Sequence, residues 1–193
     1  MNSNRVVERQ EIPIAPPRQQ FLRFQLQPSW PHQVAPLGWS IEIDRVTELV
    51  NLPLDRVVPM PHLPPAVMGV YNWRGEILWI IDLATLLGVA APTTLRRHRR
   101  LQPLIIINST AASNSALEHQ QQQPIGLMVD EISEIEWCDL ELITAALPAN
   151  IDPKLSKWAT GSWQSIAGEH LPILNGNAIC FGGACTDRAL HHS

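Results

Sequence analysis

The chain has 193 residues, of which 45% are hydrophobic, and its formal net charge is −4 at pH 7. A chain of this size and composition can form one large domain or two small ones around a real apolar core. The acidic balance gives no long-range attraction for nucleic acid or for an anionic membrane, so neither is expected as a partner.

The distribution of apolar residues and cysteines predicts a cytoplasmic protein. No apolar run approaches the roughly 20 residues of a membrane helix, and no signal-peptide core is visible, so direct membrane insertion is not expected. Cys138, Cys180 and Cys185 lack the spacing of a metal site. We interpret all three as reduced thiols, with a redox role as the alternative.

The N-terminal part of the chain predicts a tail followed by short strands. Residues 1–20 contain charges, glutamines and clustered prolines without apolar periodicity, which indicates a flexible tail. Residues 21–26 alternate apolar and polar side chains and predict the first strand. After a proline-rich turn at 28–36, residues 39–43 and 46–50 predict a second strand region that is bent between its halves.

An extended connector and a short helix are predicted on either side of residues 69–83. Residues 57–60 predict an extended piece, and the prolines in and after it forbid a regular helix. His62 is interpreted as a turn residue, with a general base as the alternative. Residues 83–88 predict one or two helical turns that end at a glycine.

The second half of the chain begins with a change in composition. The basic run Arg96–Arg100 could bind phosphates, but in an acidic protein it is better explained as a solvated linker. Residues 104–107 predict a buried strand, and residues 125–129 predict its antiparallel mate. The polar stretch 109–123 between them predicts a flexible loop.

One further helix signal lies near the C-terminus. Asp152 precedes Pro153, which is the pattern of an N-cap followed by proline at the first helical position. A short helix is therefore expected within residues 151–158. Residues 182–193 predict only a C-terminal tail.

The stretch Gly69–Leu83 carries the strongest local signal. Two β-prone runs, 70–73 and 77–81, flank a tight connection in which Asn72 and Gly75 are the residues that tolerate positive φ. This pattern predicts a β-hairpin. The returning arm is apolar almost throughout, as in a strand that is buried on both sides or wrapped into a small barrel.

Three side chains of this hairpin are candidates for contact with a partner. Arg74 sits at the turn, where it could meet a partner or a nearby carboxylate, or could only cover apolar surface with its stem. Trp73 and Trp79 could be interface anchors, although tryptophans are more often core residues.

The sequence contains an internal similarity. Residues 44–49 resemble 130–135, and residues 75–82 resemble 168–175, in the same order and at similar separations. A repeat of this length predicts two related β-subdomains. Chance similarity between short strand–turn–strand segments is the alternative.

Motifs of the common enzyme classes are absent from the sequence. There is no P-loop, dinucleotide-binding glycine pattern, zinc-protease motif or hydrolase nucleophile elbow. Asp130 and Glu131 are adjacent, so on a strand their carboxylates face opposite sides. The sequence therefore predicts a protein without catalytic activity and without a cofactor.

Two motifs resemble the CheW family, the coupling proteins of bacterial chemotaxis-type signalling. Residues 58–83 contain Gly-Val-Tyr-Asn-Trp-Arg-Gly followed by an apolar strand that ends in Asp-Leu, and residues 126–135 resemble the second signature of the family. The resemblance implies a mainly β protein with two SH3-like five-stranded β-barrel subdomains and one or two short helices. It places the domain at 21–181, with subdomain 1 at roughly 37–89 plus closing strands and subdomain 2 at 101–175.

The resemblance also implies a function and a site. Family members are adaptors that hold a CheA-type histidine kinase and the cytoplasmic tip of a chemoreceptor. A Glu48–Arg74 pair is predicted to shape the receptor-facing groove. The expected partner-binding residues are Glu48, Asn72, Trp73, Arg74, Gly75 and Trp79.

The chain departs from the family pattern at four positions. Trp73 stands where Leu is usual, Trp79 where Pro is usual, Ala84 where Arg is frequent, and Asn175 where Asp is frequent. The departures concern the identity of the partner more than the fold. A kinase-regulating module of the same fold that binds a small ligand between its barrels is the alternative function.

Overall fold

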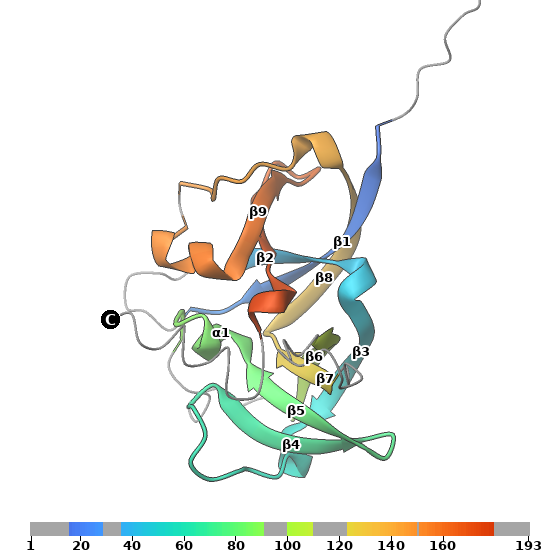
Figure 1. Cartoon of the computed structure of the whole chain (residues 1–193), viewed down its shortest axis with the longest axis vertical. Coiled ribbons are helices and arrows are strands. Elements are labelled where there is room, and N and C mark those ends of the chain that lie inside the picture. Colours follow the sequence, from blue (N-terminus) through green and yellow to red (C-terminus); the bar gives the residue numbers. More distant parts are fainter. Residues whose placement is uncertain (1–15, 29–35, 91–99, 110–122, 150, 180–193) are drawn as a thin grey trace, which may run out of the picture.

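The computed structural model describes residues 16–28, 36–90, 100–109, 123–149 and 151–179. Within these ranges the chain forms ten strands in two five-stranded sheets, which lie one above the other in Figure 1. The expected mainly β fold with two five-stranded subdomains is confirmed.

Strands in the two sheets follow the same order. The first barrel contains β3 (Val46–Pro53), β6 (Leu101–Ser109), β7 (Gln123–Met128), β5 (Glu76–Asp82) and β4 (Val67–Trp73), in that spatial order. The second barrel contains β8 (Glu131–Asp139), β1 (Arg18–Leu26), β2 (Leu37–Glu42), β10 (His170–Leu174) and β9 (Ala159–Gln164). Each barrel has one parallel pair, β5 with β7 and β10 with β2.

The segments that are similar in sequence occupy equivalent places. β3 and β8 are terminal strands of their sheets, and β5 and β10 are the fourth strands of theirs. A 3₁₀ turn follows each terminal strand, η2 (Leu54–Arg56) after β3 and η4 (Leu140–Leu142) after β8. The two subdomains that the sequence repeat predicts are therefore present.

Each barrel is closed by one isolated bridge at a glycine. Val58 pairs with Val70 beside Gly69, and Thr144 pairs with Ser162 beside Gly161. A Cβ on Gly69 would lie 2.1 Å from the Val58 carbonyl oxygen. A Cβ on Gly161 would lie 2.6 Å from the Thr144 carbonyl oxygen. Glycine is therefore required at both bridges. At each bridge the strand at one end of the sheet, β4 or β9, meets the segment that follows the strand at the other end, β3 or β8.

Three apolar clusters form the core. The largest lies between the barrels and takes side chains from both, including Trp39 and Ile41 of β2 and Ile105 and Ile107 of β6. A second cluster fills the first barrel, and a third fills the second. Alternate residues of a strand face opposite sides. β6 is apolar on both faces because one face packs against the cluster between the barrels and the other against the cluster inside the first barrel.

Short helical segments connect the strands. Helix α1 (Leu83–Leu86) is capped by Asp82, which accepts a hydrogen bond from the Thr85 backbone N–H at 3.2 Å. The chain then leaves the helix through Gly88, whose φ is 74°. The glycine that ends the helix agrees with the sequence prediction, whereas the cap at Asp82 was not predicted.

The helix predicted at 151–158 is a 3₁₀ helix, η5 (Pro153–Trp158). The Asp152 side chain accepts a hydrogen bond from the Lys154 backbone N–H at 2.9 Å. The predicted cap is therefore correct. Another 3₁₀ helix, η6 (Gly176–Ala178), follows β10.

Two expectations change at the strand ends. β1 begins at Arg18, three residues before the predicted start. The bent strand region at 39–50 is two separate strands, because the 3₁₀ turn η1 (Ile43–Arg45) sends β2 into the second barrel and β3 into the first.

Each barrel also takes strands from both halves of the chain. β2 lies in the second barrel although it falls within 37–89, and β6 and β7 lie in the first barrel although they fall within 101–175. Residues 1–15 of the predicted N-terminal tail, the predicted C-terminal tail, residues 96–99 of the basic run and residues 110–122 of the predicted loop lie outside the described residues. Residues 18–20 of the predicted N-terminal tail belong to β1 instead. Within the described ranges, no helix has the length and apolar character needed to cross a membrane.

Candidate functional site

The turn between β4 and β5 has an unusual backbone. Trp73 pairs with Glu76, which leaves a two-residue connection of Arg74 and Gly75. Both residues have positive φ, 55° and 88° respectively, as in the hairpin turns whose twist matches the flanking strands. Arginine rarely adopts this conformation, and a non-glycine residue in it carries a cost of about 1 kcal/mol or more.

The role predicted for Asn72 is corrected by this geometry. Asn72 remains in β4 opposite Ile77, and Arg74 takes the positive φ instead. The side-chain oxygen of Asn72 accepts a hydrogen bond from the Gly75 backbone N–H at 3.0 Å. Asn72 therefore closes the turn from outside it, while Gly75 has the predicted conformation.

Arg74 is held by two side chains at the exposed corner of the first barrel. Its guanidinium forms an ion pair with Glu48 of β3 at 2.8 Å. It also lies over the Trp73 ring, with its Cζ 5.1 Å from the ring centroid, which is within the range of a cation–π contact. Arg74 therefore meets a nearby carboxylate, as one of the two interpretations expects, and does not only cover apolar surface with its stem; its guanidinium also covers the Trp73 ring.

The ion pair leaves Arg74 accessible. The Arg74 side chain is 70% exposed, whereas that of Glu48 is 31% exposed. The structure thus contains the Glu48–Arg74 pair that the resemblance implies. We call Glu48, Asn72, Trp73, Arg74 and Gly75 the first-barrel corner.

The two tryptophans of the hairpin lie on opposite faces. Trp73 is half-buried and packs against the apolar cluster inside the first barrel. Trp79 pairs with Val70 and is also half-buried, but it lies on the outer side of β5 with Ile77. One flat partner surface therefore cannot contact both rings.

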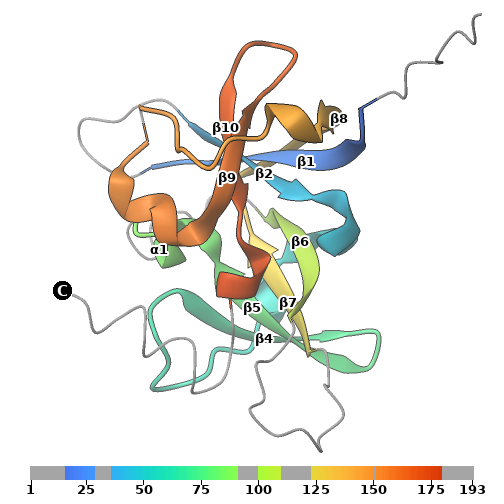
Figure 2. The same cartoon turned by 45° about the horizontal axis from the view of Figure 1, so that its top comes forward.

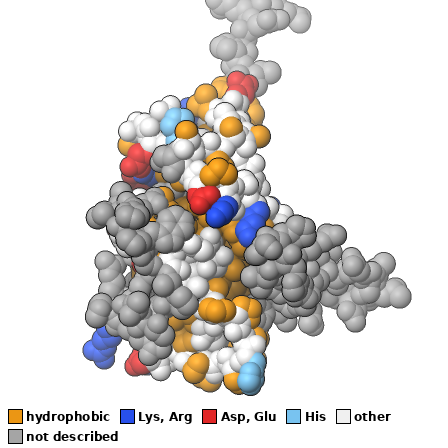
Figure 3. All heavy atoms as spheres, turned by 90° about the vertical axis from the view of Figure 1, so that its left-hand side faces the viewer, with side chains coloured by type: hydrophobic (Ala, Val, Ile, Leu, Met, Phe, Trp, Pro, Cys, Tyr) orange, Lys and Arg blue, Asp and Glu red, His pale blue; other side chains and the backbone are white. Residues whose placement is uncertain are grey.

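The outer side of the hairpin presents an apolar row of which sequence reasoning singled out only Trp79. Val58, Val70 and Trp79 are successive neighbours across three segments. Ile77 is 68% exposed and Val58 is 59% exposed. In Figure 3, apolar side chains gather at the lower end of the molecule, over the first barrel. A possible sequence signal was Ile77, an apolar residue directly after the turn.

The second barrel carries a different charged cluster near its own hairpin. Arg23 of β1 forms ion pairs with Glu134, Glu136 and Glu169, the first of them at 3.0 Å. The Arg23 side chain is 12% exposed, and that of Glu136 is 6% exposed. Glu136 also accepts a hydrogen bond from the Ile166 backbone N–H at 3.0 Å, which ties the β9–β10 turn to β8.

The two charged sites are built differently although the barrels are related. In the sequence repeat, Glu134 corresponds to Glu48, but Ala167 stands where Arg74 would be. The arginine comes from β1 instead and therefore lies within the second barrel rather than on the turn. Sequence reasoning could have noted that Arg23 is a charged residue between the apolar residues Leu22 and Phe24. It could not have identified the three carboxylates that pair with Arg23.

His62 and Cys138 are the remaining titratable candidates that the structure describes. His62 is exposed with a φ of 62°, as for a turn residue. Cys138 is buried as a free thiol, and burial, followed by the charges of Asp139 and Glu136, raises its pKa above the ordinary value. Among the described residues, no three His, Cys, Asp or Glu side chains are grouped to hold a metal ion. Cys180 and Cys185 lie outside the described residues.

Comparisons with known proteins identify the family. The CheW-like domain model matches residues 20–180. The chemotaxis protein CheW of Rhizobium meliloti is 36% identical over 77 residues, which is 40% of each chain. A probable chemotaxis protein CheW of Rhizobium etli is 36% identical over 84 residues, 44% of each chain. The matched stretch thus spans less than half the length of these curated relatives.

A solved structure has the same fold. The scaffolding protein TtCheW of Thermoanaerobacter tengcongensis matches with a TM-score of 0.61 and 20% identity, over 81% of this chain and 88% of that one. The family model covers most of the chain, and its fold agrees with the two barrels described above. The chain therefore belongs to the CheW-like domain family.

Proposed function

We propose that this protein is a cytoplasmic scaffold that couples the tip of a chemoreceptor to a CheA-type histidine kinase. The pathway would be chemotaxis, phototaxis or pilus-driven motility. The chemotaxis names of the two Rhizobium relatives and the scaffolding role named for TtCheW support this proposal. The accessible Arg74 at the first-barrel corner is the observation that carries it.

The first-barrel corner suits docking because its arginine is ordered before binding. The turn backbone, Glu48 and Trp73 together hold the Arg74 side chain in one region while most of it stays exposed. A side chain that is already ordered loses less conformational entropy when a partner binds. The guanidinium keeps donors for a carboxylate or a backbone carbonyl of the partner.

Two partners require two surfaces, and the hairpin offers one at its turn and one on the outer side of its strands. We assign the first-barrel corner to the receptor tip. The outer apolar row with Trp79, Ile77 and Val58 is assigned to the kinase, because an exposed apolar row with an aromatic residue is typical of a protein interface.

Charge reversal tests the receptor site. Arg74→Glu and Glu48→Arg should each weaken binding to a receptor cytoplasmic fragment by roughly tenfold or more, which corresponds to about 1.4 kcal/mol. Combining both changes should restore the ion pair but not receptor binding, because the exposed charge is then inverted. Arg56→Glu, an exposed arginine on η2, is the control with the same change in net charge as Arg74→Glu, whereas Glu48→Arg changes the net charge in the opposite direction.

Two further variants separate charge from backbone geometry and receptor from kinase. Arg74→Asn removes the charge but keeps a residue that tolerates positive φ, so it should fold normally and still lose receptor binding. Trp79→Ala should weaken kinase binding while receptor binding stays as in the wild type. If the Arg74 and Glu48 variants bind the receptor fragment as tightly as Arg56→Glu does, the assignment of this site is wrong.

A further inference from the structure

The sulfur-containing side chains of the described residues differ sharply in their exposure. Met60 is 43% exposed, whereas Met128 is 4% exposed and Cys138 is buried. Met68 is half-buried and packs against the cluster inside the first barrel. The other methionine and cysteine residues lie outside the described residues. Within the described ranges, Met60 therefore has the most accessible sulfur-containing side chain.

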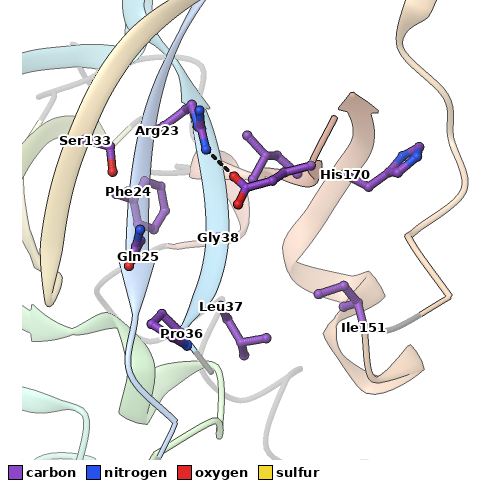
Figure 4. Close-up of a pocket in the computed structure, with 11 residues that line it drawn as sticks. Arg23, Phe24, Gln25, Pro36, Leu37, Gly38, Ser133, Ile151 and His170 are labelled. Atoms are coloured by element: carbon purple, nitrogen blue, oxygen red, sulfur yellow. Dashed lines mark hydrogen bonds and ion pairs between the residues drawn. The ribbon is translucent and has the colours of Figure 1, made fainter. Parts of the chain in front are cut away.

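The second barrel gives an oxidant little to react with. The thiolate is the reactive form of a cysteine, and burial, followed by the charges of Asp139 and Glu136, raises the pKa of the Cys138 thiol. The hollow beside β1 and β2 exposes no sulfur atom either, because none of the residues that line it contains sulfur (Figure 4). Among the described residues, an oxidant in the solvent therefore meets Met60 first.

Met60 borders the outer apolar row of the hairpin. It lies two residues after Val58, whose backbone exchanges hydrogen bonds of 2.8 and 2.9 Å with Val70 of β4. Pro59 and Pro61 flank Met60 and favour an extended backbone. Met60 therefore lies within about 7 Å of Val58 along the chain. Figure 2 shows this connector at the same end of the molecule as β4 and β5.

A peroxide can change the polarity of this row at one atom. The sulfur lone pair of a methionine attacks one oxygen of the peroxide, so that the O–O bond breaks and an S–O bond forms. Sulfur loses two electrons, and the peroxide is reduced to water or to an alcohol. The product is methionine sulfoxide, in which a polar group replaces an apolar one. A polar group that an interface buries without a hydrogen-bond partner lowers the affinity.

We propose that Met60 is a reversible oxidation site through which peroxides control docking of the kinase on the outer apolar row. This inference rests on the proposed role of that row in kinase binding. As a thioether, Met60 extends the apolar surface with an adaptable side chain. As a sulfoxide, it opposes docking. Methionine sulfoxide reductases restore the thioether, so the change can act as a switch.

Peptide mass spectrometry of the full chain after treatment with hydrogen peroxide tests the site. Met60 should form the sulfoxide roughly tenfold or more faster than Met128, because susceptibility follows exposure. Bound CheA-type kinase should slow the oxidation of Met60. Equal rates at the two methionines, or a rate at Met60 that bound kinase leaves unchanged, would overturn the proposal.

Binding measurements test the consequence of oxidation. The oxidised protein should bind the kinase roughly tenfold more weakly, and methionine sulfoxide reductase should restore the affinity. Binding of the receptor fragment should not change. Met60→Gln, which places a polar side chain at this position, should weaken kinase binding without any peroxide.

Matched variants assign the effect to one sulfur atom. Met60→Leu keeps an apolar side chain of similar volume but has no sulfur to oxidise, so its affinity for the kinase should be normal before and after peroxide treatment. Met68→Leu removes a different methionine and should remain as sensitive to peroxide as the wild type. A loss of affinity that Met60→Leu does not prevent would place the sensitive group elsewhere and overturn the proposal.

The failure of the switch and the failure of the kinase site give different results. If the untreated protein does not bind the kinase, or if Trp79→Ala binds it as tightly as the wild type, the kinase site is wrong and the switch is wrong with it. If Trp79→Ala weakens binding but complete conversion of Met60 to the sulfoxide leaves the Kd unchanged, only the switch is wrong.

Discussion

Arg23 shows how a single residue can control the second barrel. Its nearly buried side chain compensates Glu136, which is only 6% exposed. A buried charge that loses its partner is strongly destabilising, whereas an apolar pair of similar size can be tolerated. The stability of the second barrel should therefore depend on keeping both charges or neither.

Arg23→Met should lower the free energy of unfolding by about 3–5 kcal/mol, measured by urea denaturation. Arg23→Met combined with Glu136→Leu should recover most of this loss. Arg18→Met removes the ion pair between Arg18 and Asp139, in which the arginine side chain is 60% exposed. This variant should lower the free energy of unfolding by less than about 1 kcal/mol. A loss in Arg23→Met no larger than in Arg18→Met would contradict this view of the cluster.

Cys138 links the same region to pH. Its pKa is raised in the folded protein, by burial first and then by Asp139 and Glu136. Above the ordinary thiol pKa the unfolded chain releases a proton that the folded chain still holds. The contribution of Cys138 to stability is therefore complete below that pKa and falls as the pH rises through the folded pKa.

We expect the free energy of unfolding to fall more steeply between about pH 8 and pH 10 in the wild type than in Cys138→Ala. Chemical denaturation under reducing conditions at both pH values measures this difference. Because the other titrating groups are common to both proteins, identical slopes would show that Cys138 ionises equally in the folded and unfolded states.

At the scale of secondary-structure elements, the closing glycines decide whether each sheet curls into a barrel. Gly69 combines a φ of 137° with the near contact to the Val58 carbonyl oxygen described above. Gly88 also has a positive φ, 74°, but a Cβ there would meet open space. Replacing Gly88 therefore introduces only backbone strain, whereas replacing Gly69 introduces backbone strain and a steric clash.

Gly69→Ala should cost more than about 3 kcal/mol, because strain and a backbone clash add, while Gly88→Ala should cost about 1 kcal/mol. Thermal and urea unfolding measure both. Hydrogen exchange should locate the damage of Gly69→Ala in β4 and the Val58 segment. Equal losses in the two variants would mean that closure at Gly69 is not sterically restricted.

The sequence predicted those elements whose determinants are close together along the chain. The hairpin, the cap at Asp152 and the repeat are local patterns of turn residues, caps and alternating apolar residues, and the structure contains them. The Glu48–Arg74 pair was found only through the family resemblance. Residue composition alone left its role open.

The remaining features depend on contacts between distant segments. The partners of Arg23 lie between 111 and 146 residues away along the chain, so no local pattern reveals them. The parallel pairing of β10 with β2 is similarly non-local, which explains why β2 was not predicted to lie in the second barrel. The sequence predicted a positive φ at Asn72, but the structure has it at Arg74. The difference depends on the register between β4 and β5, because a shift of one residue would move the turn.

At the scale of the whole molecule, the shared core makes the two barrels one cooperative unit. The cluster between them contains Trp39 of the second barrel and Ile105 of the first, both fully buried. Shortening a side chain there removes contacts from both barrels. The barrels should therefore not unfold independently.

Ile105→Ala should lower the free energy of unfolding by about 2–5 kcal/mol and reduce hydrogen-exchange protection in both sheets. The unfolding transition should remain single when followed by tryptophan fluorescence and by circular dichroism. Leu78→Ala, inside the first barrel only, is the matched comparison and should reduce local protection mainly there. Two separated transitions in either variant would contradict a single cooperative unit.

The exchange of strands between the barrels has a consequence for synthesis of the protein. β1 and β2 are translated before the other eight strands, yet their outer neighbours in the sheet are β8 and β10, which are translated after the last strand of the first barrel. The first barrel can form as soon as β7 has emerged. Until β8 and β10 have been translated, the outer edges of β1 and β2 stay unpaired. These edges are therefore where we expect a chaperone to protect the nascent chain.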